Sequence, residues 1–191
     1  MKDWYNTLIF GAALILIWTL FRQSDGVSPS HQPIEQQTVI PQPKIYPYHG
    51  QAFEWQQIKD YDVSIIKFYA SWCGFCRREL PVLKTLKNMN VAPMFGIAVG
   101  DSEKKLDKLF TRYENPYDYN AIDKNKSAMR AFGVRGLPST VIVDKNMKVR
   151  FVYTGAMSEN DIRRKILPII NKVKKELNAS TEETKEKDTA K

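Results

Sequence analysis

Residues 62–81, "DVSIIKFYASWCGFCRRELP", decide the fold of this chain. The first nine residues are rich in β-branched and aromatic side chains, which predicts a buried strand over 62–70. Leucines then recur at helical spacing between Cys73 and Met89, which predicts a helix directly after the strand. Cys73 and Cys76 are the only two cysteines of the chain, and both fall in the first turn of this helix.

Several kinds of site use two cysteines at this spacing. A structural zinc site needs four ligands, and the only histidines, His31 and His49, lie outside the predicted helix, so zinc is disfavoured. Haem attachment needs a histidine after the second cysteine, where this chain has Arg77. A purely structural disulfide would close too small a loop to add much stability. A redox pair fits the pattern best.

The position of the pair explains how such chemistry would work. The start of a helix presents free N–H groups and the positive end of the helix dipole, which stabilise a thiolate at Cys73. Cys76 lies one turn further on the same face, so it is placed to resolve a mixed disulfide formed by Cys73.

The rest of the chain alternates between strand and helix patterns. Strands are predicted over 91–100, 139–144 and 148–154, and helices over 102–114, around 126–132, and from about 159 to 175. This order predicts an α/β domain with a central mixed sheet, parallel in one half and antiparallel in the other, covered by helices on both faces.

The composition of the sequence divides the chain into four segments. Residues 1–22 contain 18 consecutive uncharged residues and are expected to form a transmembrane anchor, with a cleavable signal peptide as the less favoured alternative. Residues 23–44 carry four prolines and no periodicity, as in a tether. Residues 45–175 form the predicted domain, and the charged residues 176–191 are expected to be disordered.

The chain has 29 basic and 21 acidic residues, and 23 of the basic against 13 of the acidic ones fall within 45–175. The domain therefore carries about +10. No cluster of basic and aromatic residues resembles a nucleic-acid-binding motif, so nucleic acid is not an expected partner.

Three stretches, "YASWCGFCRRELPVL", "FGVRGLPSTVIVD" and "VRFVYTG", together resemble the thioredoxin-like family. The greatest likeness is to its membrane-tethered branch, which includes the cytochrome c maturation proteins DsbE/CcmG and the related TlpA and ResA proteins. The resemblance covers about residues 50–175. It implies a thioredoxin fold with a βα element inserted between the cysteine pair of the first stretch and the proline of the second.

The resemblance also assigns roles to residues. It implies that Cys73 is the exposed nucleophile, Cys76 the resolving thiol and Pro138 a cis-proline facing the disulfide. Neighbouring residues are expected to contact substrate or tune the thiols: Trp72, Gly74, Phe75 and Leu137. No metal and no cofactor other than the Cys73–Cys76 disulfide are expected.

Two positions depart from the family pattern. Ser139 follows the expected cis-proline where many DsbE-type proteins have a glutamate, and Lys67 stands where thioredoxin has a buried aspartate. Lys67 either points at the sulfurs and lowers their pKa values or extends to the sheet edge. Glu79 either replaces the missing carboxylate or is solvated on the helix.

The resemblance implies a thiol:disulfide oxidoreductase in the cytoplasmic (inner) membrane, with a single span and its catalytic domain on the periplasmic side. It would reduce disulfides of exported proteins such as apocytochrome c, with electrons from a transmembrane thiol reductase. Two alternatives remain open: an oxidase or isomerase that serves a secretion or conjugation system, and a non-catalytic tethered binding module.

Overall fold

The computed structural model describes residues 42–50 and 54–189. The expected anchor over 1–22 and nearly all of the expected tether lie outside these residues. Within the two described ranges, no helix combines the length and the apolar character that a membrane span requires.

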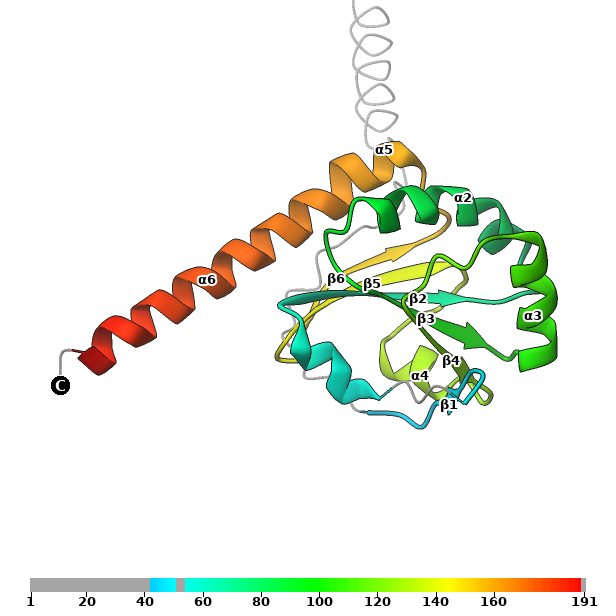
Figure 1. Ribbon diagram of the computed structural model, residues 1–191, viewed down its shortest axis with the longest axis horizontal. Helices are drawn as coiled ribbons and strands as arrows, with labels where there is room; N and C mark the ends of the chain where they lie inside the picture. The colour runs from blue at the N-terminus through cyan, green and yellow to red at the C-terminus, as the bar shows by residue number, and fades with distance from the viewer. Residues whose placement is uncertain (1–41, 51–53, 190–191) are drawn as a thin grey trace, which may run out of the picture. The chain divides into compact units, whose positions relative to one another are not determined.

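A six-stranded mixed sheet forms the centre of the domain, with the strand order β1-β4-β3-β2-β5-β6 (Figure 1). β3 runs parallel to β2 and β4, whereas β5 is antiparallel to β2 and β6. The strands are β1 (Tyr46–Pro47), β2 (Val63–Tyr69), β3 (Met94–Val99), β4 (Tyr119–Asp123), β5 (Ser139–Asp144) and β6 (Val149–Thr154). The predicted parallel and antiparallel halves are therefore confirmed, and β2 lies where they meet.

Helices cover both faces of this sheet (Figure 1). They are the 3-10 helix η1 (Trp55–Asp60), α2 (Gly74–Asn88), α3 (Glu103–Arg112), α4 (Ser127–Ala131), α5 (Glu159–Asp161), the π-helical turn η2 (Ile162–Ile166) and α6 (Leu167–Thr189). β4 and α4 lie between α3 and Pro138, which agrees with the additional βα element that the resemblance implies.

Two hydrophobic cores result from the alternation of side chains along the strands. Ile65 and Tyr69 of β2 join the core under α2, α3, η2 and α6. Ile66 and Phe68 join the core on the opposite face, with residues of η1 and α4. All seven residues of β2 are buried, as expected for a strand covered on both faces.

Helix α6 corrects the expected C-terminal boundary. The sequence predicted that the last helix ends near residue 175 and that 176–191 are disordered, but α6 continues to Thr189. Ile170, Val173 and Leu177 are buried at helical spacing and hold its first half against the sheet. Of the twelve residues of α6 after Leu177, six are lysine, glutamate or alanine, which are strong helix formers, and the helix continues over them beyond its last buried residue.

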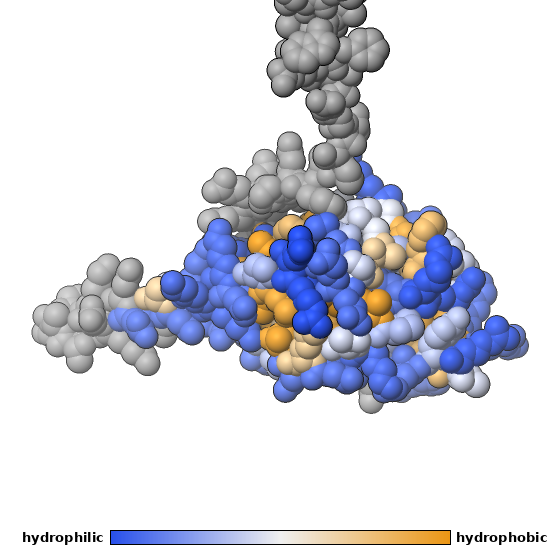
Figure 2. Space-filling model, turned by 90° about the horizontal axis from the view of Figure 1, so that it is seen from above, coloured by the Kyte–Doolittle hydropathy of each residue, from blue (hydrophilic) through white to orange (hydrophobic). Residues whose placement is uncertain are grey.

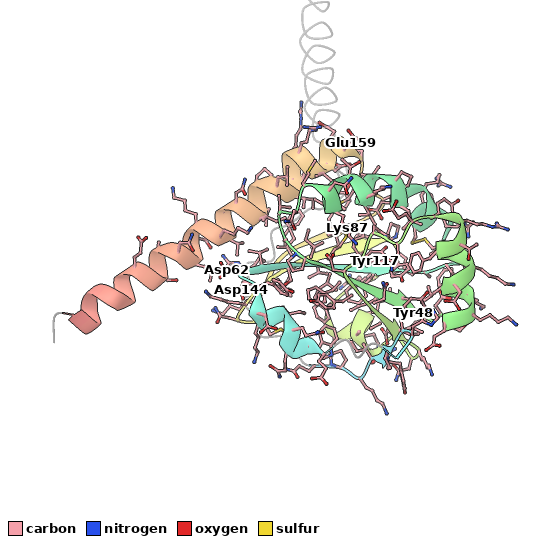
Figure 3. The ribbon with its side chains drawn as sticks, viewed as in Figure 1. Tyr48, Asp62, Lys87, Tyr117, Asp144 and Glu159 are labelled. Atoms are coloured by element: carbon pink, nitrogen blue, oxygen red, sulfur yellow. A yellow bond between two sulfur atoms is a disulfide. The ribbon has the colours of Figure 1, made fainter. Side chains whose placement is uncertain are left out.

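Tyr117 packs in the core between the sheet and α2 (Figure 3). Its ring stacks on Tyr69 with a centroid separation of 4.6 Å, and the Tyr69 hydroxyl donates to Asn120 Oδ1 at 2.9 Å. Gly96 of β3 lies directly beneath this ring. A Cβ atom there would come within 2.7 Å of Tyr117 Cγ and 2.8 Å of Asn120 Oδ1, so only glycine fits.

We expect Gly96→Ala to lower the free energy of unfolding by about 1–3 kcal/mol, because the added methyl must displace the Tyr117 ring from its stack. The matched control is Gly74→Ala, where the nearest side-chain atom would be 3.7 Å from the added Cβ. Urea denaturation of the oxidised protein measures both changes. Equal midpoints for the two variants would contradict the tight contact at Gly96.

Candidate active site

The two cysteines form a disulfide, Cys73–Cys76, at the junction of β2 and α2. Cys73 is the N-cap residue of α2, and its sulfur accepts a hydrogen bond from the backbone N–H of Cys76 at 3.2 Å. The resemblance implied an exposed Cys73. In the disulfide form, however, the exposed fraction is only 7% for Cys73 and 4% for Cys76.

The turn that delivers Cys73 is fixed by the adjacent strand. Asp101 follows the end of β3, and its carboxylate accepts from the Ser71 backbone N–H at 2.6 Å and from the Ser71 hydroxyl at 2.9 Å. The carboxyl ends of parallel strands meet at one edge of a sheet, so an acidic residue just after the second strand could have been suspected from the sequence. Asp101 was not among the residues predicted for the site.

The Leu137–Pro138 peptide bond is cis, as expected. Pairing of β5 with β2 places Ser139 opposite Phe68, so this bond lies beside the carboxyl end of β2 and the disulfide. The Pro138 carbonyl accepts from the Gly155 N–H at 2.8 Å, which ties the turn to the end of β6.

A hollow of about 460 Å³ joins the disulfide to this turn. Trp72, Gly74 and Phe75 line it from the cysteine side and Leu137 from the proline side; the remaining lining residues are Cys73, Val99, Lys126, Met129, Arg135 and Gly136. The structure thus brings together the four neighbouring residues for which we predicted substrate contact or tuning of the thiols. That role remains a prediction.

Two large hydrophobic side chains at the rim of this hollow face solvent. Trp72 is 55% exposed and Phe75 is 61% exposed, and they are the exposed large hydrophobic residues of the described chain. The guanidinium of Arg78 lies over the Phe75 ring at 4.4 Å. Exposed aromatic residues concentrated at one place are typical of a surface that another molecule covers.

Ser139 is fully buried, and its hydroxyl donates to the Gly136 carbonyl at 2.8 Å. The residue that replaces the family's glutamate therefore stabilises the proline turn from within. It provides no charge to the cysteines.

Lys67 and Glu79 form a buried ion pair. The Lys67 Nζ atom lies 2.9 and 3.0 Å from the two carboxylate oxygens of Glu79 and 2.8 Å from Thr140 Oγ1. Glu79 Oε1 also accepts from the Met157 backbone N–H at 2.9 Å. The pair joins β2, α2, β5 and the segment after β6.

Two of the expected arrangements are therefore wrong. Lys67 has no exposed surface, so it does not extend to the sheet edge, and Glu79 is 2% exposed, so it is not solvated. The ammonium of Lys67 is directed to Glu79 and Thr140. Burial lowers the pKa of Lys67, and the adjacent carboxylate opposes this shift. Their charges compensate each other beneath the first turns of α2.

We expect Lys67→Met to lower the free energy of unfolding by about 3–5 kcal/mol, because it leaves Glu79 buried without its counter-ion. The double variant Lys67→Met/Glu79→Leu should recover most of this loss. The control is Lys145→Met, which removes an exposed ion pair with Asp62 at the edge of the domain opposite α3 (Figure 3). It should lower the free energy of unfolding by at most about 1 kcal/mol. A double variant no more stable than Lys67→Met would contradict the proposed charge compensation.

Curated proteins that are similar to this chain are named for thiol–disulfide chemistry. The chain is 29% identical over 102 residues to the thiol-disulfide oxidoreductase ResA of Geobacillus thermodenitrificans, a match that covers 52% of this chain and 58% of ResA. It is 24% identical over 174 residues to the thiol:disulfide interchange protein DsbE of Escherichia coli, with 88% of this chain and 92% of DsbE covered. The chain thus spans little more than half the length of the ResA relative.

Solved structures and a family model complete the comparison. A DsbE protein from Chlorobium tepidum superposes with a TM-score of 0.58 at 21% identity, over 74% of this chain and 99% of that one. DsbF from MTB gives a TM-score of 0.59 at 22% identity, over 68% and 98%. These similarities establish the thioredoxin-like fold. The Redoxin family model matches residues 37–166, which is more than half of the 191 residues, and the chain therefore belongs to the Redoxin family.

Proposed function

We propose that this protein is a thiol:disulfide oxidoreductase that works by dithiol–disulfide exchange. The observation that carries this proposal is the Cys73–Cys76 disulfide at the start of α2, which opens onto a hollow beside a cis-proline. The names of the ResA and DsbE relatives agree with it.

In the reducing direction the dithiol form begins the reaction. The Cys73 thiolate attacks one sulfur of a substrate disulfide, forms a mixed disulfide and releases the other substrate sulfur as a thiolate, which takes up a proton. The Cys76 thiol loses its proton, and its sulfur attacks Cys73. The Cys73–Cys76 bond forms and the second substrate thiol leaves. Two electrons pass to the substrate, and the protein ends as the disulfide.

The backbone at the start of α2 favours this order of events. The Cys76 N–H already points at the Cys73 sulfur, and α2 has no acidic residue in its first turn. Negative charge on Cys73 is therefore stabilised by a hydrogen bond and by the helix dipole, which lowers the pKa of a thiol at this position.

The hollow is suited to an extended segment that carries the substrate cysteine. Trp72 and Phe75 provide apolar contact on one side, and the turn at Leu137 and Pro138 provides backbone on the other. Proline has no N–H group to donate at this point, so the backbone groups of its neighbours are the ones that can pair with an extended substrate segment.

The direction of electron flow and the cellular address are further parts of the proposal. We place the domain on the periplasmic side of the inner membrane, held by the 18 uncharged residues 4–21 and the proline-rich segment after them. There it would reduce disulfides of exported proteins, with apocytochrome c as the candidate substrate, and would receive electrons from a transmembrane thiol reductase. The printed names of the DsbE relatives support the exchange chemistry on which this part of the proposal rests.

The exchange mechanism predicts different behaviour for the two cysteines. We expect Cys76→Ser to accumulate a mixed disulfide with a peptide disulfide, because Cys73 can attack but nothing resolves the intermediate. Cys73→Ser should accumulate none. Non-reducing electrophoresis followed by mass spectrometry measures both. Trapping through Cys76 in the Cys73→Ser variant would reverse the assigned roles, and the absence of trapping in both variants would favour a binding module.

A reducing role predicts the redox potential of the pair. We expect a midpoint nearer to the value of about −270 mV for thioredoxin than to the value of about −120 mV for the oxidant DsbA. Equilibration with glutathione or dithiothreitol buffers, read out by thiol alkylation and mass spectrometry, gives the midpoint. A value near −120 mV would assign the protein to disulfide formation in place of reduction.

A further inference from the structure

A second hollow, of about 410 Å³, lies on the other side of the Ser71 turn between α2 and α3. Four of its seven lining residues are cationic, and none is acidic. The lining residues are Ser71, Arg77, Lys105, Lys108, Leu109, Arg112 and Tyr113, and we call this hollow the basic cleft. Figure 2 shows hydrophilic residues along the right-hand edge of the molecule, where α3 lies in Figure 1.

The cations of the basic cleft have no acidic partner among the described residues. Lys105, Lys108 and Arg112 are exposed, and neither they nor Arg77 take part in the ion pairs that the described residues form. Arg77 donates to the Ser71 carbonyl at 2.8 Å, a contact that leaves its charge uncompensated.

Three carboxylates near the basic cleft are engaged elsewhere. Asp107 of α3 accepts from the Tyr48 hydroxyl at 2.8 Å and lies 2.6 Å from His49 Nε2. Asp101 is held by Ser71 and by the Ser102 N–H. Glu114, just beyond α3, pairs with Lys84. The charge of the cleft is therefore available to a ligand.

Arg77 lies where a positive charge destabilises its own helix, α2. α2 begins at Gly74, and Arg77 lies in its first turns together with Arg78, while the first turn has no acidic residue. Cations at this end of a helix are unfavourable because they face the positive end of the dipole. α3 shows the usual arrangement, with Glu103 in its first turn and Arg112 in its last. The cations of α2 thus concentrate positive potential at the disulfide at some cost to the helix.

The basic cleft adjoins the reacting bond. Ser71 lines the cleft and is two residues before Cys73, and Arg77 is the residue after Cys76. A protein segment bound at the disulfide can therefore continue over the Ser71 turn into the cleft. The hollow on the other side of the disulfide already accounts for apolar contacts near the substrate cysteine.

We propose that the basic cleft binds an acidic segment adjacent to the reactive cysteine of the protein's disulfide substrate. This inference rests on the oxidoreductase function proposed above and adds its substrate class: protein disulfides flanked by aspartate and glutamate. Cationic side chains around a cleft concentrate anionic partners and raise association rates by about 10- to 1,000-fold at low salt.

The test compares two disulfide-linked peptide dimers, each peptide with a single cysteine, followed by three glutamates in one and three glutamines in the other. Full-length protein in nonionic detergent is reduced, and its oxidation by each dimer is followed by tryptophan fluorescence or thiol alkylation. The rate for each dimer is divided by the rate at which dithiothreitol reduces the same dimer. This normalisation is needed because the glutamates also alter the intrinsic reactivity of the peptide disulfide. In a second pair of peptides, the three glutamates or three glutamines precede the cysteine.

We expect the glutamate dimer to react at least about tenfold faster than the glutamine dimer at low ionic strength, in one of the two peptide orientations. The preference should fall as salt is raised, since a Debye length of about 3 Å at 1 M screens these charges. The variant Lys105→Gln/Lys108→Gln/Arg112→Gln should bring the ratio of the two rates close to one.

The matched control, Lys59→Gln/Arg164→Gln/Lys175→Gln, removes the same net charge from exposed positions outside the cleft and should retain the preference. Equal rates for the two dimers with the wild-type protein would overturn the inference and leave the oxidoreductase function standing. The preference for glutamate could instead survive in the cleft variant, or be lost only in Lys126→Gln/Arg135→Gln. Either result would overturn the inference and assign the preference to the hollow between the disulfide and the cis-proline turn. Failure of both dimers to oxidise the protein would refute the oxidoreductase function itself.

Discussion

The contact between Lys67 and Glu79 constrains the whole arrangement around the disulfide. An ammonium group without exposed surface must have compensating partners nearby, because burial of an isolated charge costs several kcal/mol. Lys67 projects from the central strand into the space beneath α2, and Glu79 is the carboxylate that meets it there. Any rotation of α2 about its axis would separate the two charges, so the pair fixes the face that α2 turns to the sheet. That orientation in turn fixes Cys76, one turn before Glu79.

The turn at residues 70–73 is constrained in a similar way, here by a residue that follows β3, a strand adjacent to β2. Asp101, just after β3, accepts from the backbone N–H and the hydroxyl of Ser71, and Cys73 then caps α2 with its own sulfur. Thus β3, through Asp101, and β5, through the cis-proline turn, determine how the disulfide is presented. The rigid sheet supplies the geometry, while Trp72 and Phe75 remain available for contact with another molecule.

Most of the fold follows from local patterns in the sequence. The strand over 62–70 and the paired strands after Pro138 are rich in β-branched and aromatic residues, the cysteine-bearing helix has leucines at helical spacing, and the structure has each of these elements. β4 was not predicted as a separate strand, because Tyr119–Asp123 is short and contains two polar residues. Asn120 and Asp123 are nonetheless buried, since their side chains satisfy neighbouring polar groups through hydrogen bonds.

The site shows the limit of such reasoning more clearly. The sequence identified Lys67 and Glu79 as unusual but not as partners, because their contact depends on how α2 lies over β2. The same holds for the basic cleft, whose cations come from two helices separated by β3. Local patterns specify which residues a helix exposes, but the packing of two helices decides which exposed residues share a cleft.

The charges around the disulfide have consequences for selectivity as well as for attraction. The N–H groups at the start of α2, the guanidinium of Arg77 and the cations of α3 all add positive potential at one place. Such a site favours a thiolate on Cys73 and a carboxylate on a bound segment, and it repels a segment rich in lysine and arginine. Discrimination between partners often relies on repulsion as much as on contact. A strongly basic domain with its cations concentrated beside the reactive bond is therefore able to select among disulfides that its apolar hollow alone would not distinguish.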